Sequence, residues 1–184
     1  MKMAKKLLAL VLTGVMAMSV LTGCGSTASR QATGKLEGML KEANPKATVE
    51  VGSEELANKA IEAATTKEGK FKTDVSGNVK TVLKAAGNGE KYVWYACFEA
   101  EGKNKTDKAQ AIADEILEKK ADGTVTIDYY NAVNYLYVKI PGKYNIKAGD
   151  EFELSMKEFT VTNDDGTTTD WIMAVVTCKA VENK

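Results

Sequence analysis

Apolar side chains recur every three or four residues in four segments, as on the buried face of an amphipathic helix. These segments are residues 36–43, 54–64, 77–86 and 106–120. Asn44 and Pro45 follow the first segment, and Gly87 follows the third. Because proline and glycine commonly end helices, these residues mark two helix ends. Ser53 and Thr106 are expected to cap the second and fourth helices through their hydroxyl groups.

A different pattern covers residues 91–101, where both alternating sets of side chains are largely apolar. Such a strand is covered on two sides, so we predict that it lies in the middle of a sheet. Residues 48–51 predict a further short strand. The last third of the chain consists of β-branched and aromatic runs separated by turn residues. These runs are residues 124–130, 133–140, 151–161 and 170–181.

The order of these elements predicts an α+β domain, with helices packed on a four- to five-stranded antiparallel meander. A helix followed by a run of strands is similar to the cystatin-like and NTF2-like rolls. That resemblance rests on element order alone and implies a curved sheet wrapped around a helix.

The N-terminal residues have the composition of an export signal. Three lysines fall within residues 1–6, and residues 7–20 are apolar apart from small polar residues. Because a membrane-spanning helix needs about 20 apolar residues, this run is better explained by a cleaved signal peptide than by a permanent anchor.

The residues that follow the apolar run are Leu21, Thr22, Gly23 and Cys24. This tetrapeptide resembles the lipobox of bacterial lipoproteins. The resemblance implies cleavage before Cys24 and a diacylglyceryl group on its thiol, which would anchor the mature chain to the extracytoplasmic face of the cell membrane. Two acyl chains suffice for stable anchoring.

These features predict three parts of the chain. Residues 1–23 are the signal peptide, residues 24–34 have the small and polar composition of a flexible tether, and residues 35–184 form one globular domain.

Composition excludes several kinds of function. The chain has no histidine, which removes the usual catalytic triads and nearly all zinc sites. Arg30 is its one arginine, and the chain without its signal peptide is mildly acidic. We therefore expect no nucleic-acid partner, no metal and no cofactor.

Two cysteines remain beyond the lipobox, Cys97 and Cys178, and both fall in apolar strand-like runs. An exported protein can form a disulfide between them if their strands are neighbours. The alternative is two buried thiols, because cysteine is among the most buried residue types.

Aromatic residues concentrate in the predicted strands and suit the binding of sugars, peptides or protein surfaces. In residues 133–140, Tyr135 and Tyr137 alternate with aliphatic residues, so we predict that both face a concave sheet surface or solvent. Together with Tyr129 and Trp171 they form the predicted ligand-binding set.

Two functions follow from these observations. The first is a non-catalytic binding module at the cell envelope, whose partner is an envelope protein, a glycan or a small ligand. The second is a small hydrolase that uses paired carboxylates on a polysaccharide. Its candidate acids are Glu99, Glu101, Asp128 and Asp150. The oxygen-rich segment 163–170 is better explained by an exposed hairpin turn than by a calcium loop.

Overall fold

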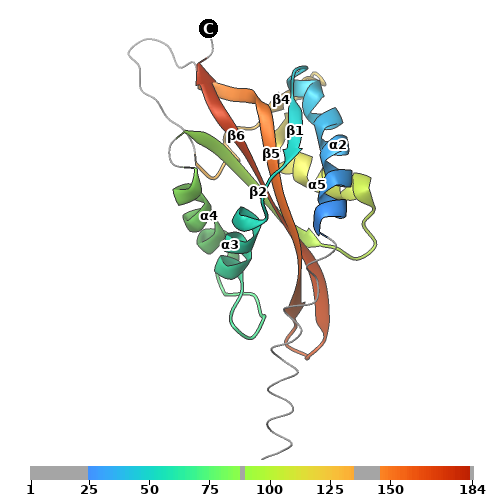
Figure 1. Ribbon diagram of the computed structural model, residues 1–184, viewed down its shortest axis with the longest axis vertical. Coiled ribbons are helices and arrows are strands. Elements are labelled where there is room, and N and C mark those ends of the chain that lie inside the picture. The colour runs from blue at the N-terminus through green and yellow to red at the C-terminus, as the bar shows by residue number, and fades with distance from the viewer. Residues whose placement is uncertain (1–24, 88–89, 135–145, 183–184) are drawn as a thin grey trace, which may run out of the picture.

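The computed structural model describes residues 25–87, 90–134 and 146–182. The described elements include four helices, a four-stranded sheet and a small two-stranded sheet (Figure 1). The helices are α2 (Gly25–Ala43), α3 (Glu55–Ala64), α4 (Val75–Ala86) and α5 (Lys105–Ile116). The strands are β1 (Thr48–Val51), β2 (Lys91–Glu99), β3 (Leu117–Lys119), β4 (Val125–Ile127), β5 (Ile146–Thr162) and β6 (Thr168–Glu182).

The larger sheet has the strand order β1-β5-β6-β2. β5, β6 and β2 are antiparallel, but β1 runs parallel to β5. The α+β class is therefore confirmed, whereas the purely antiparallel meander is wrong. Hydrophobic patterning identifies strands without giving their direction or neighbours, which explains the error. The finer likeness to cystatin-like or NTF2-like rolls stays a prediction.

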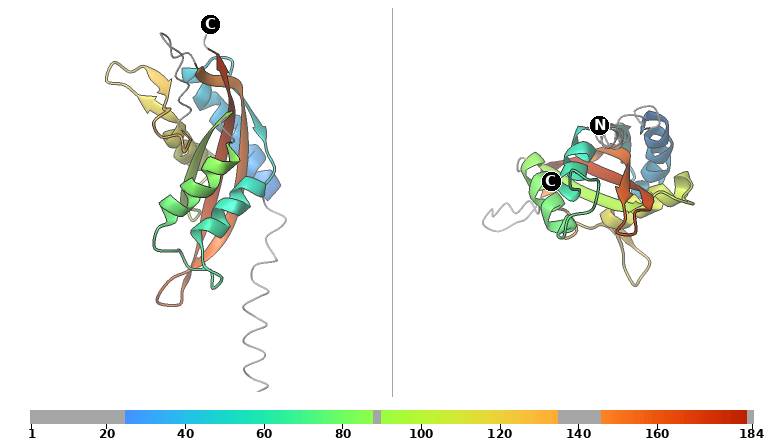
Figure 2. Two further views of the ribbon diagram at one scale, coloured as in Figure 1. Left: turned by 90° about the vertical axis from the view of Figure 1, so that its left-hand side faces the viewer. Right: turned by 90° about the horizontal axis from the view of Figure 1, so that it is seen from below.

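Helices cover both faces of this sheet, as the two views of Figure 2 show. On one face, α2 and α5 pack on Trp94, Phe152 and Ile172, and we call this cluster the α2/α5 core. On the other face, α3 and α4 pack on Val93 and Val175, and this cluster is the α3/α4 core. Alternation along each strand supplies one side chain to each core in turn.

β2 lies at an edge of the sheet, not in its middle as predicted. Both of its faces are apolar because a pair of helices covers each of them. Its outer edge is partly closed by the chain that follows β4. Val133 donates its N–H to the carbonyl of Val93, and Asn134 accepts the N–H of Val93.

The four predicted helices form, with shifted ends. Asp74 caps α4 by accepting the N–H of Gly77, so this helix begins two residues earlier than predicted. α3 begins at Glu55, so its N-cap residue is Glu54 and not Ser53 as predicted. The Glu54 side chain makes no capping bond, but the Ser155 hydroxyl accepts the N–H of Ala57 in the first turn at 3.1 Å. α5 is capped by Asn104 instead of Thr106 and ends at Ile116. The residues after it form β3. Leu117, the first residue of β3, still packs against the α2/α5 core, whereas Glu118 and Lys119 are exposed.

The segment predicted to be a flexible tether is helical. α2 begins at Gly25, and Ser29, Ala32 and Thr33 are buried in the same stripe as Leu36 and Leu40. Their small size was interpreted as tether composition, but small residues let α2 lie close to the neighbouring α5 and the sheet. Cys24 lies outside the described residues.

Two predicted strands near the end of the domain differ from the structure. The strand predicted at 124–130 is reduced to β4, which pairs with β3 in the small sheet. Val133 and Asn134 are not part of a strand, and the rest of the strand predicted at 133–140 lies outside the described residues.

Candidate functional site

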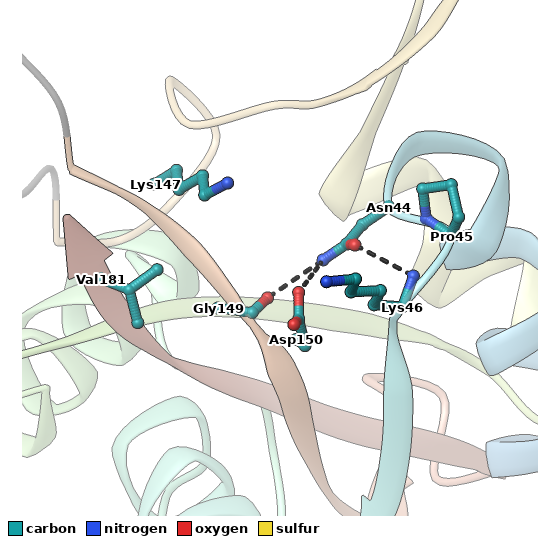
Figure 3. A pocket seen from close by; sticks show the side chains of 7 residues that line it. All are labelled: Asn44, Pro45, Lys46, Lys147, Gly149, Asp150 and Val181. Carbon is teal, nitrogen blue, oxygen red and sulfur yellow. Dashed lines mark hydrogen bonds between the residues drawn. The ribbon is translucent and has the colours of Figure 1, made fainter. Parts of the chain in front are cut away.

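A hollow of about 400 Å³ lies at one end of the larger sheet, where the turn after α2 meets the start of β5 (Figure 3). Its lining residues are Asn44, Pro45, Lys46, Lys147, Gly149, Asp150 and Val181. Three separate parts of the chain contribute: the α2–β1 turn, the first residues of β5 and the last residues of β6.

Asn44 fixes the turn that forms one wall of the hollow. Its backbone N–H donates to the carbonyl of Leu40 at 2.8 Å, and its side-chain oxygen accepts the N–H of Lys46 at 3.2 Å. The side-chain amide then crosses to β5, donating to the Gly149 carbonyl at 3.2 Å and to Asp150 Oδ1 at 3.1 Å. One residue therefore fastens the end of α2 to β5.

The opposite wall is an irregularity in β5. The pairing register of β5 with β6 shifts between Ala148 and Phe152, so the segment between them bulges. The carbonyl of Gly149 in this bulge also accepts the thiol of Cys178 at 3.5 Å. A Cβ atom at position 149 would lie 3.2 Å from the carbonyl oxygen of Lys179, so glycine allows this close approach.

The charges around the hollow are two ammonium groups and one carboxylate. Lys46 and Lys147 extend into the space from opposite walls (Figure 3), and neither forms an ion pair with another described residue. The carboxylate of Asp150 is held by Asn44. Because lysine offers three N–H donors and no acceptor, the hollow suits a ligand that carries an anionic or oxygen-rich group.

The structure does not bring Tyr129 and Trp171 together. The Tyr129 ring lies 4.9 Å from that of Tyr92 beside the α2/α5 core, and its hydroxyl accepts the N–H of Ala148 at 3.1 Å. Burial raises the pKa of the Tyr129 hydroxyl. Trp171 instead packs 4.9 Å from Phe71, on the side of the sheet that carries the α3/α4 core. The two residues lie on opposite faces of the sheet, so one ligand face does not contain both.

Tyr135 and Tyr137, the other two members of the predicted ligand-binding set, lie outside the described residues. Their exposure and orientation therefore remain sequence-based predictions.

Cys97 and Cys178 are free thiols, so the structure contains no disulfide between them. Cys178 is buried, as the alternative predicts, whereas Cys97 is only partly buried. Their strands are neighbours, as a disulfide requires, but Cys97 pairs with Met173 and lies five residues along β6 from Cys178. An odd separation in a strand places two side chains on opposite faces. Cys97 accordingly packs against the α3/α4 core and Cys178 belongs to the α2/α5 core.

The candidate catalytic acids do not all lie in one place, although Glu99 and Glu101 are only two residues apart. Glu99 pairs with Trp171 near the far end of the sheet from Asp150. Glu101 lies in the turn after β2. Asp128 accepts the N–H groups of Tyr130 and Asn131, so its carboxylate stabilises a turn.

The segment after β5 is the hairpin turn that was predicted. Asn163 and Gly166 close it with backbone hydrogen bonds, and Gly166 has a φ of 84°. In the described ranges, no three cysteine, aspartate or glutamate side chains are grouped so that they could hold a metal ion.

Sequence reasoning missed the hollow. In the sequence, Asn44 and Pro45 indicate only the end of a helix, Gly149 and Asp150 separate two strand-like runs, and Asp150 is a candidate catalytic acid. The signal that could have identified the site is Lys147-Ala-Gly-Asp150, where glycine interrupts a β-rich run and marks a bulge. Nothing in the sequence shows that this bulge lies beside Asn44.

Comparison of the chain with protein-family models, with curated proteins and with solved structures gives no match. Within the described part of the chain, no helix combines the length and the apolar character of a membrane-spanning segment.

Proposed function

We propose that this chain is a bacterial envelope lipoprotein, anchored through a lipid on Cys24, and that its folded domain is a non-catalytic binding module. The observation that carries the proposal is the tetrapeptide Leu21-Thr22-Gly23-Cys24 directly after a basic start and a short apolar run. These three features coincide at the positions where a lipoprotein signal requires them.

Membrane anchoring follows from the chemistry of the modified cysteine. Each buried methylene contributes about 0.8 kcal/mol, so a diacylglyceryl group holds the protein at a bilayer where one chain would bind only marginally. The mature chain begins at Cys24 in this proposal and remains on the extracytoplasmic face of the membrane.

Binding is assigned to the hollow because its geometry is suited to holding a ligand. Its two walls are joined by the Asn44–Gly149 hydrogen bond, and two lysines without ion partners in the described structure extend into it. An envelope glycan, a small anion or an acidic segment of an envelope protein presents the acceptor groups that these lysines can bind.

The anchoring is tested by growing cells that express the full chain with an alkyne-bearing fatty acid. The native protein is expected to carry the label and to sediment with membranes. Cys24→Ser should lose both properties, whereas Cys97→Ser, a matched change of another cysteine, should keep them. Equal labelling of the native protein and Cys24→Ser, or no labelling of either, would show that the proposed anchor is wrong.

The binding role is tested by titrating the labelled domain with inorganic phosphate and with soluble envelope glycan fragments. Saturable changes in the NMR signals of Asn44 and Gly149 are expected with at least one of them. The double variant Lys46→Gln, Lys147→Gln should lose these changes, while Lys80→Gln, Lys84→Gln on exposed positions of α4 should retain them. Signals that do not move with either probe would argue against the hollow as a ligand site.

A further inference from the structure

β5 is far longer than β1, its neighbour in the sheet (Figure 1). The four residues of β1 pair with residues 151–154 of β5, and Gly52 then donates its N–H to the Leu154 carbonyl at 2.8 Å. β5 continues to Thr162, whose N–H donates to the carbonyl of Gly69 at 3.0 Å. Between these two hydrogen bonds, β5 itself forms the edge of the sheet.

The direction of the backbone groups along this edge follows from the alternation of the strand. Every second residue of an extended strand directs its N–H and its carbonyl to the same side. Leu154 and Thr162 direct their bonded groups away from β6. The residues at alternate positions between them therefore face outward too, namely Met156, Glu158 and Thr160. In the part of the chain that the structure describes, their N–H and carbonyl groups bond to no other residue.

We call residues 156–160 the open edge of β5. Both faces of the strand are covered here, since Met156 is 2% exposed in the α2/α5 core and the Ser155 hydroxyl accepts the N–H of Ala57 in α3 at 3.1 Å. Because β5 is already ordered, only an incoming segment loses conformational freedom when it binds. Unpaired backbone groups on an ordered strand can accept a further strand.

The charges beside the open edge are paired within the domain. Glu158 forms an ion pair with Lys108 at 2.7 Å, and Lys157 forms one with Glu54 at 3.5 Å. This neutralised charge favours uncharged residues in the incoming segment. A second copy of the chain fits less well, since antiparallel pairing centred on the open edge sets Glu158 opposite its own counterpart, and like charges at directly opposed positions are destabilising.

An exposed apolar residue lies where the open edge begins. Val51, the last residue of β1, is 43% exposed, although Val49 on the same face of the strand is buried in the α2/α5 core. A segment that follows the line of β1 places a side chain beside Met156, next to Val51. That position suits an aliphatic, β-branched residue, because such a residue removes Val51 from water.

From these observations we propose that the open edge of β5 is a docking site for an extended, uncharged segment of a partner protein, which adds to the sheet as a short strand. Its aliphatic side chains lie toward Val51 and its polar ones toward Lys157. The site lies roughly 27 Å along β5 from Asp150 in the hollow, so it depends neither on the hollow nor on the proposed anchor.

The test probe is an end-capped peptide of about seven alternating valine and threonine residues with a solubilising tail, which spans the open edge. It is added to the full chain purified in detergent, and amide hydrogen exchange is followed by NMR. Exchange at Met156, Glu158 and Thr160 is expected to be fast without the peptide and at least about tenfold slower with it. A fully N-methylated version, which has the same side chains and no N–H donors, should give no protection.

A protein variant tests the same contact from the other side. Glu158→Pro removes the central N–H of the open edge and sets a proline ring where the segment would lie, so the affinity for the peptide should fall by at least about tenfold. Glu158→Ala is the matched control and should bind like the native protein. Both changes break the ion pair with Lys108, but only the proline removes the N–H.

Three results would overturn the proposal, and none of them requires the proline variant to fold. The first is no protection at about 1 mM peptide, or equal protection by the N-methylated version. The second is slow exchange at the three positions without any peptide, because the edge would then be closed within the chain. The third is slow exchange that appears only as the protein concentration rises, which would assign the edge to a second copy of the chain.

Discussion

Asn134 occupies the place of a neighbouring strand at the outer edge of β2. Its side-chain oxygen accepts the N–H of Val93 at 2.9 Å, and its amide donates to the carbonyl of Lys91. The residue is only 5% exposed. The Asn134 amide thus takes the place of a peptide group. It provides hydrogen-bond partners for buried backbone groups that an edge strand would otherwise leave unpaired.

We therefore expect Asn134→Ala to lower the free energy of unfolding by about 1–3 kcal/mol, because the Val93 N–H loses its acceptor in a buried site. Urea unfolding followed by tryptophan fluorescence measures this loss. Asn131→Ala is the control, since Asn131 is exposed and bonds to Glu115, and its effect should be clearly smaller. Equal losses would mean that the backbone contact of Asn134 contributes no special stability.

The two thiols give a second prediction at the residue scale. Burial raises the pKa of Cys97 to about 11 and that of Cys178 to about 12, from a reference of 9.0. The reactive thiolate is then about a hundredfold rarer for Cys97 and a thousandfold rarer for Cys178 than in an unfolded chain.

Alkylation of the native domain with iodoacetamide at neutral pH should therefore be slow at both positions and become fast in concentrated urea. Mass spectrometry of the alkylated peptides reports each cysteine separately. Rapid modification of either thiol in the folded protein would contradict the burial that the structure shows.

At the scale of elements, α5 carries a complete capping box at its N-terminus. The Asn104 side chain accepts the N–H groups of Thr106 and Asp107, and the Asp107 carboxylate accepts the N–H of Asn104 in return. Replacing a cap of this kind by alanine costs about 1 kcal/mol.

Asn104→Ala should thus lower the free energy of unfolding by about 1 kcal/mol, measured by urea unfolding. Thr106→Ala is the matched control, because Thr106 lies inside the helix and its side chain does not serve as the cap. If the threonine variant were the less stable of the two, the cap would be at Thr106, where the sequence pattern alone placed it.

Element identity could largely be predicted from the sequence, because helix and strand periods are local properties. The four helices and the strands β1, β2, β5 and β6 all overlap predicted segments, although α2 and β5 begin earlier than predicted. Positions across the sheet could not be predicted, since β1 and β5 are about a hundred residues apart and only tertiary packing makes them neighbours. The hollow escaped prediction for the same reason, because its walls come from distant segments.

At the scale of the whole molecule, the absence of histidine makes stability insensitive to pH over a wide range. No side chain of the chain has an ordinary pKa between about 5 and 8. Several carboxyls have a lowered pKa in the fold, among them Glu37 through Lys41 and Asp165 through Thr167. A carboxyl whose pKa is lower in the folded than in the unfolded protein stabilises the fold at any pH above its unfolded pKa. That contribution is lost as the pH falls through the folded pKa.

Urea midpoints of the domain should therefore be nearly equal between about pH 5.5 and 8 and fall below about pH 4. Glu37→Gln should show a smaller acid-dependent fall than the native domain, because it no longer carries the carboxyl that Lys41 and the Val49 N–H stabilise. A marked change of the midpoint between pH 6 and 7 would contradict this prediction, because it would require a group that titrates in that range.

The separation of Cys97 and Cys178 by the thickness of the sheet has a consequence for biogenesis. The two sulfur atoms lie on opposite faces of the sheet and form no disulfide with each other. Folding of the domain therefore requires no disulfide oxidase, no disulfide isomerase and no particular redox potential of the surrounding glutathione. A version that starts at Gly25 is therefore expected to reach the same fold when it is synthesised in a reducing cytosol and when it is secreted. Reductants in the surroundings of the cell would likewise leave the domain intact.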